Sequence, residues 1–148
     1  MLLELAIGDA HGAGFEYADE QIVLYNTLAG YVQHSRHNIA PGQYTDDTQM
    51  SIAVAEAIIS GEPWTSKLLA DAFVLAFRRD PRDGYARGFQ AFTGDVDTVA
   101  TIALAAASCS EEYEKDLPPQ LVVSLENGRY GREYLTELDV ELLASVTT

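Results

Sequence analysis

The chain has 148 residues, of which 47% are hydrophobic, and this length and content predict a single domain, residues 1–148, with an apolar core. Its formal net charge is −14 and only 9 residues are Lys or Arg, which argues against nucleic acid as a partner, because phosphate binding requires basic side chains. A strongly acidic surface keeps a protein in solution by repulsion, so we expect a cytoplasmic protein. Residues Met1 to Ile7 are too short and too acidic for a signal peptide or a membrane span.

The first expected element is a short helix from Met1 to Ile7, which ends in a glycine-rich turn from Gly8 to Gly14. The glycines of that turn allow positive φ angles and close approach of another backbone segment. A loop with several glycines is weak evidence of a site when it stands alone.

The next segment, from Asp19 to Gly42, shows no sustained helical period, and we interpret it as a long ordered loop. Ile22 to Tyr25 is also compatible with a short strand, although no partner strand is expected elsewhere. Long ordered loops are often functional. Two interpretations of the basic side chains in this loop stay open, contact with a substrate phosphate or simple exposure to solvent; these side chains are His34, Arg36 and His37.

Two acidic segments each precede an apolar helix. Thr45-Asp46-Asp47 comes before a helix expected from Met50 to Ile59, and Asp95 to Thr98 comes before a helix expected from Val99 to Ala107. Both helices are apolar on nearly all sides, which is typical of buried helices. We expect them to pack together with their N-termini adjacent.

Adjacent N-termini would gather four carboxylates, and four like charges in a partly dry place require protonation or a cation. The four are Asp46, Asp47, Asp95 and Asp97. Carboxylates and threonine hydroxyls form an all-oxygen ligand set, which Mg²⁺, Mn²⁺ or Ca²⁺ prefers and zinc does not. The alternative is that Thr-Asp-Asp is an ordinary helix cap with acidic residues in the first turn. Spacing alone does not decide between these.

Further helices are expected along the rest of the chain. Gly61 ends the first apolar helix as its C′ residue, and Thr65 or Ser66 caps a helix from Lys67 to Arg79. The apolar stripe of that helix is expected in the core; it consists of Leu68, Leu69, Ala72, Phe73, Leu75, Ala76 and Phe77. Three more helices are expected, over Tyr85 to Phe92, Pro118 to Glu126 and Gly131 to Ser145.

Three blocks of this sequence, in order, resemble the signature segments of the ADP-ribosylglycohydrolase family: Gly8 to Glu16, Pro41 to Met50 and Gly94 to Ala100. The resemblance implies an all-α fold, a compact orthogonal helical bundle. It also implies a hydrolase that uses two Mg²⁺ ions, with Mn²⁺ as an alternative, to cleave ADP-ribose from a modified protein or small-molecule carrier.

The resemblance also assigns roles to particular residues. The mobile acidic residue near the scissile bond falls on Glu16. The family's metal ligands fall on six positions: Thr45, Asp46, Asp47, Asp95, Asp97 and Thr98.

One departure from the family is large. Family members carry a long middle section that contacts the adenosine and diphosphate, whereas here Phe92 runs almost directly into the second acidic segment. Metal binding therefore carries over better than substrate clamping does. Loss of the middle would also expose apolar faces, so we expect a homodimer.

Two other functions stay open at this stage. One is a non-catalytic remnant that binds metal or ADP-ribose. The other is a structural helical protein whose aspartates only cap helices.

Overall fold

The fold is described from a computed structural model, which describes residues 1–82, 101, 104–105, 108, 114 and 116–146. This part of the chain is helical and contains no strand, which confirms the predicted all-α fold. The helices are α1 (Leu2–Ala13), α2 (Asp19–Tyr25), α3 (Asp46–Ile59), α4 (Ser66–Arg79), α6 (Pro119–Ser124) and α7 (Arg132–Val146).

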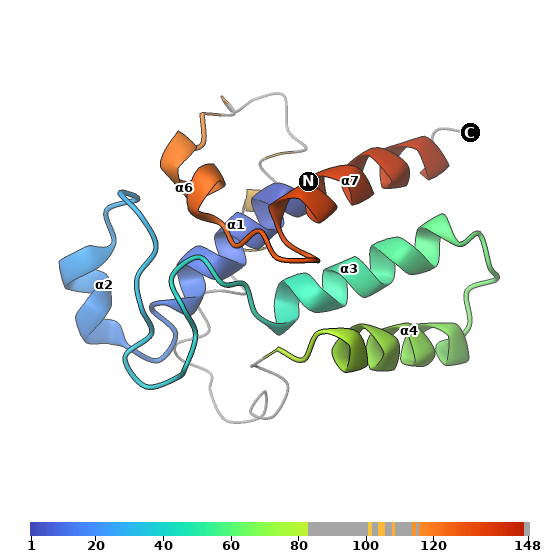
Figure 1. The fold of residues 1–148 in the computed structure, drawn as a ribbon, viewed down its shortest axis with the longest axis horizontal. Helices are drawn as coiled ribbons and strands as arrows, with labels where there is room; N and C mark the ends of the chain where they lie inside the picture. Colours follow the sequence, from blue (N-terminus) through green and yellow to red (C-terminus); the bar gives the residue numbers. More distant parts are fainter. Residues whose placement is uncertain (83–100, 102–103, 106–107, 109–113, 115, 147–148) are drawn as a thin grey trace.

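Helix α3 lies between α4 and α7, and α1 packs against both α3 and α7 (Figure 1). Helix α2 and the loop after it lie on the side opposite the C-terminus. The core forms where α1, α3 and α7 meet, together with the segment that leads into α3 and with α6. Its largest fully buried apolar side chains are Leu2, Ile7, Tyr44, Ile52, Leu121 and Leu135.

Helix α1 runs through the glycines as far as Ala13, so the prediction that it would end at Ile7 is wrong. Each helical glycine costs about 1 kcal/mol relative to alanine. Burial of Ile7, Ala10 and Ala13 against the core outweighs that cost. The N-terminus of α1 is held by α7, because the backbone amide of Leu2 donates to both carboxylate oxygens of Asp139, at 3.0 and 2.9 Å.

The expected close approach at the glycines occurs just after α1. A Cβ atom on Gly14 would lie 2.5 Å from the carbonyl oxygen of Val32, so only glycine lets the loop at Val32 reach the end of α1. The φ angle of Gly14 is −65°, hence its role is to leave space and not to adopt a left-handed conformation.

The segment Asp19–Tyr25 is a helix, so both the loop and the strand interpretations of it are wrong. Its apolar residues face solvent: Val23 is 86% exposed and Leu24 66%, whereas the polar Gln21 is buried. A helical period in a sequence arises from one buried apolar face. This helix buries no such face, which is why the sequence shows no period here.

Helix α3 begins at Asp46, four residues before the expected Met50, so the first acidic segment forms its first turn. Gly61 follows the helix with φ +66°, which confirms its predicted role as the C′ residue.

Helix α4 is capped as predicted, because the Thr65 hydroxyl accepts a hydrogen bond from the Leu68 amide at 3.1 Å. Its expected core stripe is largely wrong. Only Ala76 is buried, whereas Leu75 and Phe77 are 61% and 41% exposed. Helix α4 packs on α3, and four other residues of the stripe, Leu68, Leu69, Ala72 and Phe73, are half-buried.

The last two helices agree with the sequence. Helix α6 begins at Pro119, a proline in the first turn, and α7 begins one residue after Gly131. The helices expected over Tyr85 to Phe92 and Val99 to Ala107 lie mostly or wholly outside the described residues. The expected packing of the second of these on α3 therefore stays a prediction.

Candidate functional site

The N-terminus of α3 is capped by Asp9, a fully buried residue of α1. Its Oδ1 accepts from the Thr45 hydroxyl at 2.8 Å, and its Oδ2 accepts from the Thr48 hydroxyl at 2.6 Å. The backbone amides of both threonines also donate to the carboxylate, at 2.9 to 3.1 Å. Asp9 thus satisfies amides that a helix start leaves without an intrahelical partner.

Burial raises the pKa of Asp9 to about 6, and the hydrogen bonds from Thr48 and Thr45 act in the opposite direction. At neutral pH the group is therefore mainly a carboxylate. The amide dipoles of α3 point their positive end toward this carboxylate and offset part of the cost of burying its charge.

This arrangement shows which residue caps the helix, one of the two roles that the sequence allowed for Thr45. Thr45 occupies the N-cap position, yet its side chain accepts no hydrogen bond from the helix. Its hydroxyl instead donates its proton to Asp9. A hydroxyl oxygen that donates in this way can still accept a bond or bind a cation through its lone pairs. The helix cap is Asp9, and Thr45 is not the ordinary cap that the spacing allowed.

The donor set at the start of α3 fits a hard cation. The Thr45 oxygen and the half-buried carboxylates of Asp46 and Asp47 come from three consecutive residues. Within the part of the chain that the structure describes, no three His, Cys, Asp or Glu side chains are grouped so that they could hold a metal. The rest of the predicted ligand set lies outside the described residues: Asp95, Asp97 and Thr98.

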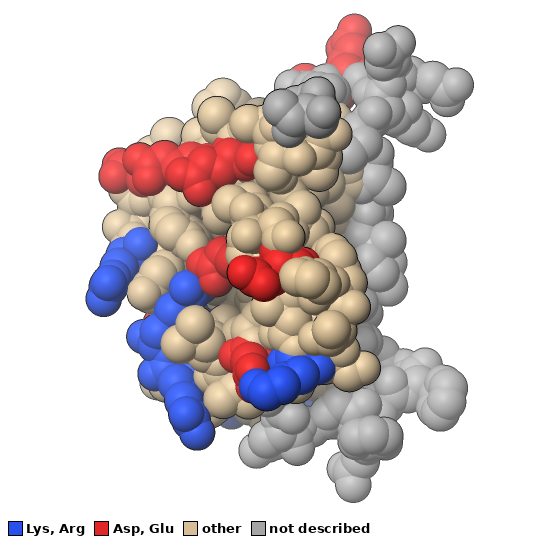
Figure 2. Space-filling model, turned by 90° about the vertical axis from the view of Figure 1, so that its right-hand side faces the viewer, with Lys and Arg blue, Asp and Glu red and all other residues tan. Residues whose placement is uncertain are grey.

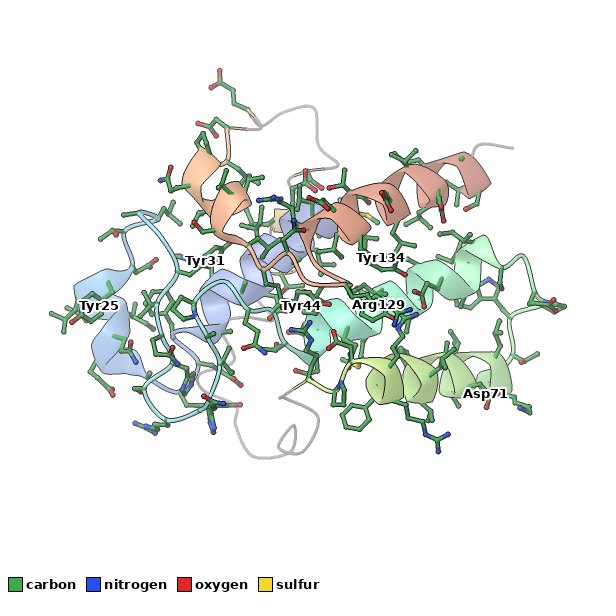
Figure 3. All side chains as sticks on the ribbon, viewed as in Figure 1. Tyr25, Tyr31, Tyr44, Asp71, Arg129 and Tyr134 are labelled. Atoms are coloured by element: carbon green, nitrogen blue, oxygen red, sulfur yellow. The ribbon has the colours of Figure 1, made fainter. Side chains whose placement is uncertain are left out.

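The residue before this donor set is held by the C-terminal part of the chain. Tyr44 lies where α1 and the start of α3 meet (Figure 3). Its amide donates to Oε1 of Glu126 at 3.1 Å, and its hydroxyl donates to the Tyr130 carbonyl at 3.0 Å.

Arg82 makes a further contact with Tyr44. Glu126, Tyr130 and Arg82 together form a brace around this residue. The Arg82 guanidinium lies 4.1 Å from the centre of the Tyr44 ring and donates to Glu126 and Asp80, both at 2.6 Å. Burial raises the pKa of Glu126, and the Arg82 charge opposes this shift. The sequence analysis missed Arg82 and Glu126, which lie 44 positions apart, since no local pattern pairs them.

Gly42 fixes the path of the same loop. Its φ angle is +81°, and a Cβ atom there would lie 2.2 Å from the carbonyl oxygen of Ser124. The Glu126 amide also donates to the Gly42 carbonyl at 2.9 Å. The loop that leads to Thr45 is therefore fitted closely against residues 124–126.

Glu16, the predicted catalytic residue, lies on the turn between α1 and α2 and is partly buried. Its backbone carbonyl is 2.8 Å from Nε2 of His34, and the next residue, Tyr17, has a φ angle of +51°. His34 is only 3% exposed, so its description as a simple exposed loop residue is wrong.

Asp9 lies within the first of the three sequence blocks, Gly8 to Glu16, but no role was predicted for it. The available signal was an acidic residue close to Ile7 and Ala10 in an otherwise largely uncharged segment, because an aspartate is rarely buried without partners.

A separate cavity of about 250 Å³ lies between α3 and α7. Its lining includes the last residue of α3, Ile59, so it lies at the end opposite the first acidic segment; the lining residues are Glu56, Ile59, Ser60, Tyr134, Glu137, Leu138 and Glu141. Figure 2 views the molecule from that end and shows a row of acidic side chains across its upper part, with further acidic side chains beside basic ones lower down. Of the predicted site residues that the structure describes, Glu16, Thr45, Asp46 and Asp47 do not line this cavity.

When the sequence is compared with known protein families, residues 1–93 match the family model of ADP-ribosylglycohydrolase. The chain belongs to the ADP-ribosylglycohydrolase family. The family match includes Glu16, Asp9 and Thr45 to Asp47, but it ends before the second acidic segment.

One relative within the curated proteins is ADP-ribosylarginine hydrolase Tri1 of Serratia proteamaculans, strain 568. The two sequences are 31% identical over 88 residues, which make up 60% of this chain and 23% of the relative. The match thus spans less than a quarter of the relative's length. No solved structure matches this ADP-ribosylglycohydrolase family chain. None of the helices among the residues described here is long and apolar enough to cross a membrane.

Proposed function

We propose that this chain is a Mg²⁺-dependent hydrolase that cleaves ADP-ribose from a modified carrier. The observation that supports the proposal is the start of α3, where Asp9 holds the hydroxyl of Thr45, the residue directly before Asp46 and Asp47. Family membership supports the same conclusion. Because the relative Tri1 is named an ADP-ribosylarginine hydrolase, we propose arginine-linked ADP-ribose as the first substrate to test.

Six side chains would hold the metal, from Thr45, Asp46, Asp47, Asp95, Asp97 and Thr98. When bound, Mg²⁺ supplies charge that orients the ribose hydroxyls and polarises a water molecule. Each of the two helix starts would contribute carboxylates to this charge balance.

Glu16 would take a proton from the attacking water. The water oxygen forms a bond to the anomeric carbon, the bond from that carbon to the carrier breaks, and the leaving group gains a proton. The transition state is oxocarbenium-like, as in other glycoside cleavage. The brace on Tyr44 would serve this step by keeping the Thr45 oxygen in place, since a displacement of about 1 Å can cost on the order of a hundredfold in rate.

A titration with Mg²⁺ tests the metal. Millimolar Mg²⁺ or Mn²⁺ should raise the melting temperature, because a ligand that binds only the native state stabilises it. The double variant Asp47→Asn with Asp97→Asn should lose this rise. Asp71→Asn is the matched control, since Asp71 lies on the exposed side of α4, and it should keep the rise. An unchanged melting curve of the wild type in saturating Mg²⁺, Mn²⁺ and Ca²⁺ would exclude the shared metal site.

Turnover tests the reaction. We expect slow, Mg²⁺-dependent release of ADP-ribose from an arginine-linked substrate, with serine-linked and O-acetyl forms tested beside it. Glu16→Gln should lower the rate and leave the Mg²⁺ melting shift intact. If the wild type binds Mg²⁺ but releases no ADP-ribose from any of these, the non-catalytic binding remnant is the correct alternative.

We also propose that the protein forms a homodimer. Large apolar side chains are exposed on α2, α4, α6 and α7, which is typical of surfaces that bind a partner; they include Val23, Leu24, Tyr25, Val74, Leu75, Val123, Val140 and Val146. Light scattering should give the mass of two chains. Leu24→Glu on α2 and Val140→Glu on α7 then identify which of these faces forms the contact. A monomer at high concentration would exclude the dimer.

A further inference from the structure

His34 makes three hydrogen-bonding contacts that together fix its protonation state. Its Nδ1 accepts from the backbone amides of Arg36 and His37, both at 2.9 Å. Because Nδ1 accepts two bonds, it carries no proton, and the neutral ring holds its proton on Nε2. That proton is donated to the Glu16 carbonyl, 2.8 Å away.

A second contact joins the same two segments. The loop at Val32 lies so close to Gly14 that a side chain there would collide with the Val32 carbonyl. Residues 32 to 34 of the loop therefore contact the chain on both sides of Phe15. Val32 packs closely against Gly14, and His34 is hydrogen-bonded to Glu16.

The turn that carries Glu16 also needs such support. Tyr17 has a φ angle of +51°, a left-handed conformation that costs roughly 1–2 kcal/mol for a residue with a side chain. Strained backbone of this kind persists only when the surrounding contacts impose it.

We propose that His34 is a positioning residue for Glu16, whose neutral imidazole ties the Glu16 turn to the loop that follows α2. This inference rests on the role proposed for Glu16 above, and it adds a residue from outside the metal ligands. His34 acts through the Glu16 backbone and does not itself touch the substrate.

The surroundings favour the neutral ring. Burial is the main cause that lowers the pKa of His34; the hydrogen bond to Glu16 opposes this shift, and the charges of His37 and Arg36 add to it. The His37 ring lies 4.5 Å away, and Arg36 pairs with Glu20 of α2 at 3.8 Å on the exposed side. Protonation would place a second N–H against the two amides that Nδ1 now accepts.

Two substitutions separate the two functions of the ring. Asparagine offers an acceptor where Nδ1 lies, so His34→Asn keeps the local turn and loses the bond to Glu16. Glutamine offers a donor where Nε2 lies, so His34→Gln keeps the bond to Glu16 and loses the local acceptors. Each variant is therefore the control for the other.

Amide hydrogen exchange in the full chain is the first measurement, because it reports local opening without requiring activity. Loss of one hydrogen bond is worth about 1 kcal/mol. In His34→Asn, the amides of Phe15 and Ala18 should therefore exchange about fivefold faster than in the wild type. In His34→Gln, those two amides should stay within about twofold, while the amides of Arg36 and His37 should exchange faster.

Activity is the second measurement. His34→Asn should lower kcat more than it changes KM, and His34→Gln should restore most of the rate. In another outcome, the wild type shows no turnover while the two variants still differ in amide exchange as described. That result would contradict the proposed hydrolase and would still support the contact between His34 and Glu16.

Two results would overturn the inference. The first is equal exchange of Phe15 and Ala18 in both variants and the wild type. The second needs no variant and so remains decisive if the variants fail to fold: an imidazole ¹⁵N spectrum of wild-type protein that places the His34 proton on Nδ1.

Discussion

The carboxylate of Asp9 in α1 accepts two hydrogen bonds from Thr48 in α3, one from the backbone amide at 2.9 Å and one from the hydroxyl at 2.6 Å. Both residues are fully buried. The crossing of α1 and α3 is therefore fixed by a polar contact as well as by apolar packing. Because the same carboxylate binds the Thr45 hydroxyl, the contact also orients the first proposed metal ligand.

Removal of the Thr48 hydroxyl should destabilise the protein. Thr48→Val keeps the shape of the side chain but takes one donor from a buried carboxylate, which costs about 1–3 kcal/mol. Urea unfolding measures the change. Thr48→Ser should retain most of the stability through its hydroxyl. Thr136→Val, at an exposed position of α7, is the control and should change stability by less than about 0.5 kcal/mol. Equal stability of Thr48→Val and wild type would mean that the bond contributes nothing.

Asp9 also predicts a pH dependence. Its pKa rises from its usual value to about 6 in the native state, so the native protein binds this proton more tightly than the unfolded chain does. The contribution of Asp9 to the free energy of unfolding is thus largest below the unfolded pKa and is lost as pH rises through about 6.

Asp9→Asn cannot titrate and isolates this effect. The difference in unfolding free energy between wild type and Asp9→Asn should fall by about 1.3 kcal/mol from pH 5 to pH 7, given about 1.4 kcal/mol for each unit of pKa shift. Urea unfolding of both proteins at the two pH values measures it. A difference that stays constant, or rises with pH, would show that the native pKa is not raised.

Gly42→Ala should be strongly destabilising, because the new Cβ would meet the Ser124 carbonyl in addition to the cost of its positive φ. Gly61→Ala is the matched control: Gly61 also has a positive φ, but it has open space around it. The control should lose roughly 1–2 kcal/mol from backbone conformation alone. Thermal unfolding of both variants measures the contrast, and similar losses in the two would show that residues 124–126 can move away.

Arg82→Met should cost about 1–3 kcal/mol, a value reduced from that of a fully buried pair because Glu126 and Asp80 are partly exposed. The change leaves two carboxylates without their cation. Lys67→Met removes the exposed ion pair with Asp71 and should have little effect. Urea unfolding compares them. If Arg82→Met also weakens the Mg²⁺ melting shift, the brace on Tyr44 supports the ligand loop as well as the fold.

Much of the helical framework could be predicted from sequence, because local chemistry marks it. The roles of Thr65 as a helix cap and of Gly61 as a C′ residue are predicted correctly, because capping and a positive φ are local requirements. Helix α2 could not be predicted, because it buries no apolar face. The start of α3 was placed too late, because the cap comes from Asp9, 36 positions before Thr45.

The sequence marks some residues of the candidate site and gives no sign of others. Asp46 and Asp47 stand out through their spacing before an apolar run. The brace from Arg82 and Glu126, and the contact of His34 with Glu16, depend on which segments the fold brings together. Such contacts leave no periodic or local mark in the sequence.

The Asp139 cap on α1 has a consequence for the order in which the chain folds. The amide of Leu2 and its acceptor in α7 are 137 positions apart, and α1 in turn supplies the cap of α3. During synthesis, the first helix therefore leaves the ribosome long before its capping partner exists. Contacts of such long range close slowly, because a large loop must be ordered first. Nascent chains that stop before α7 should thus bind chaperones, and release should follow only when α7 has been made.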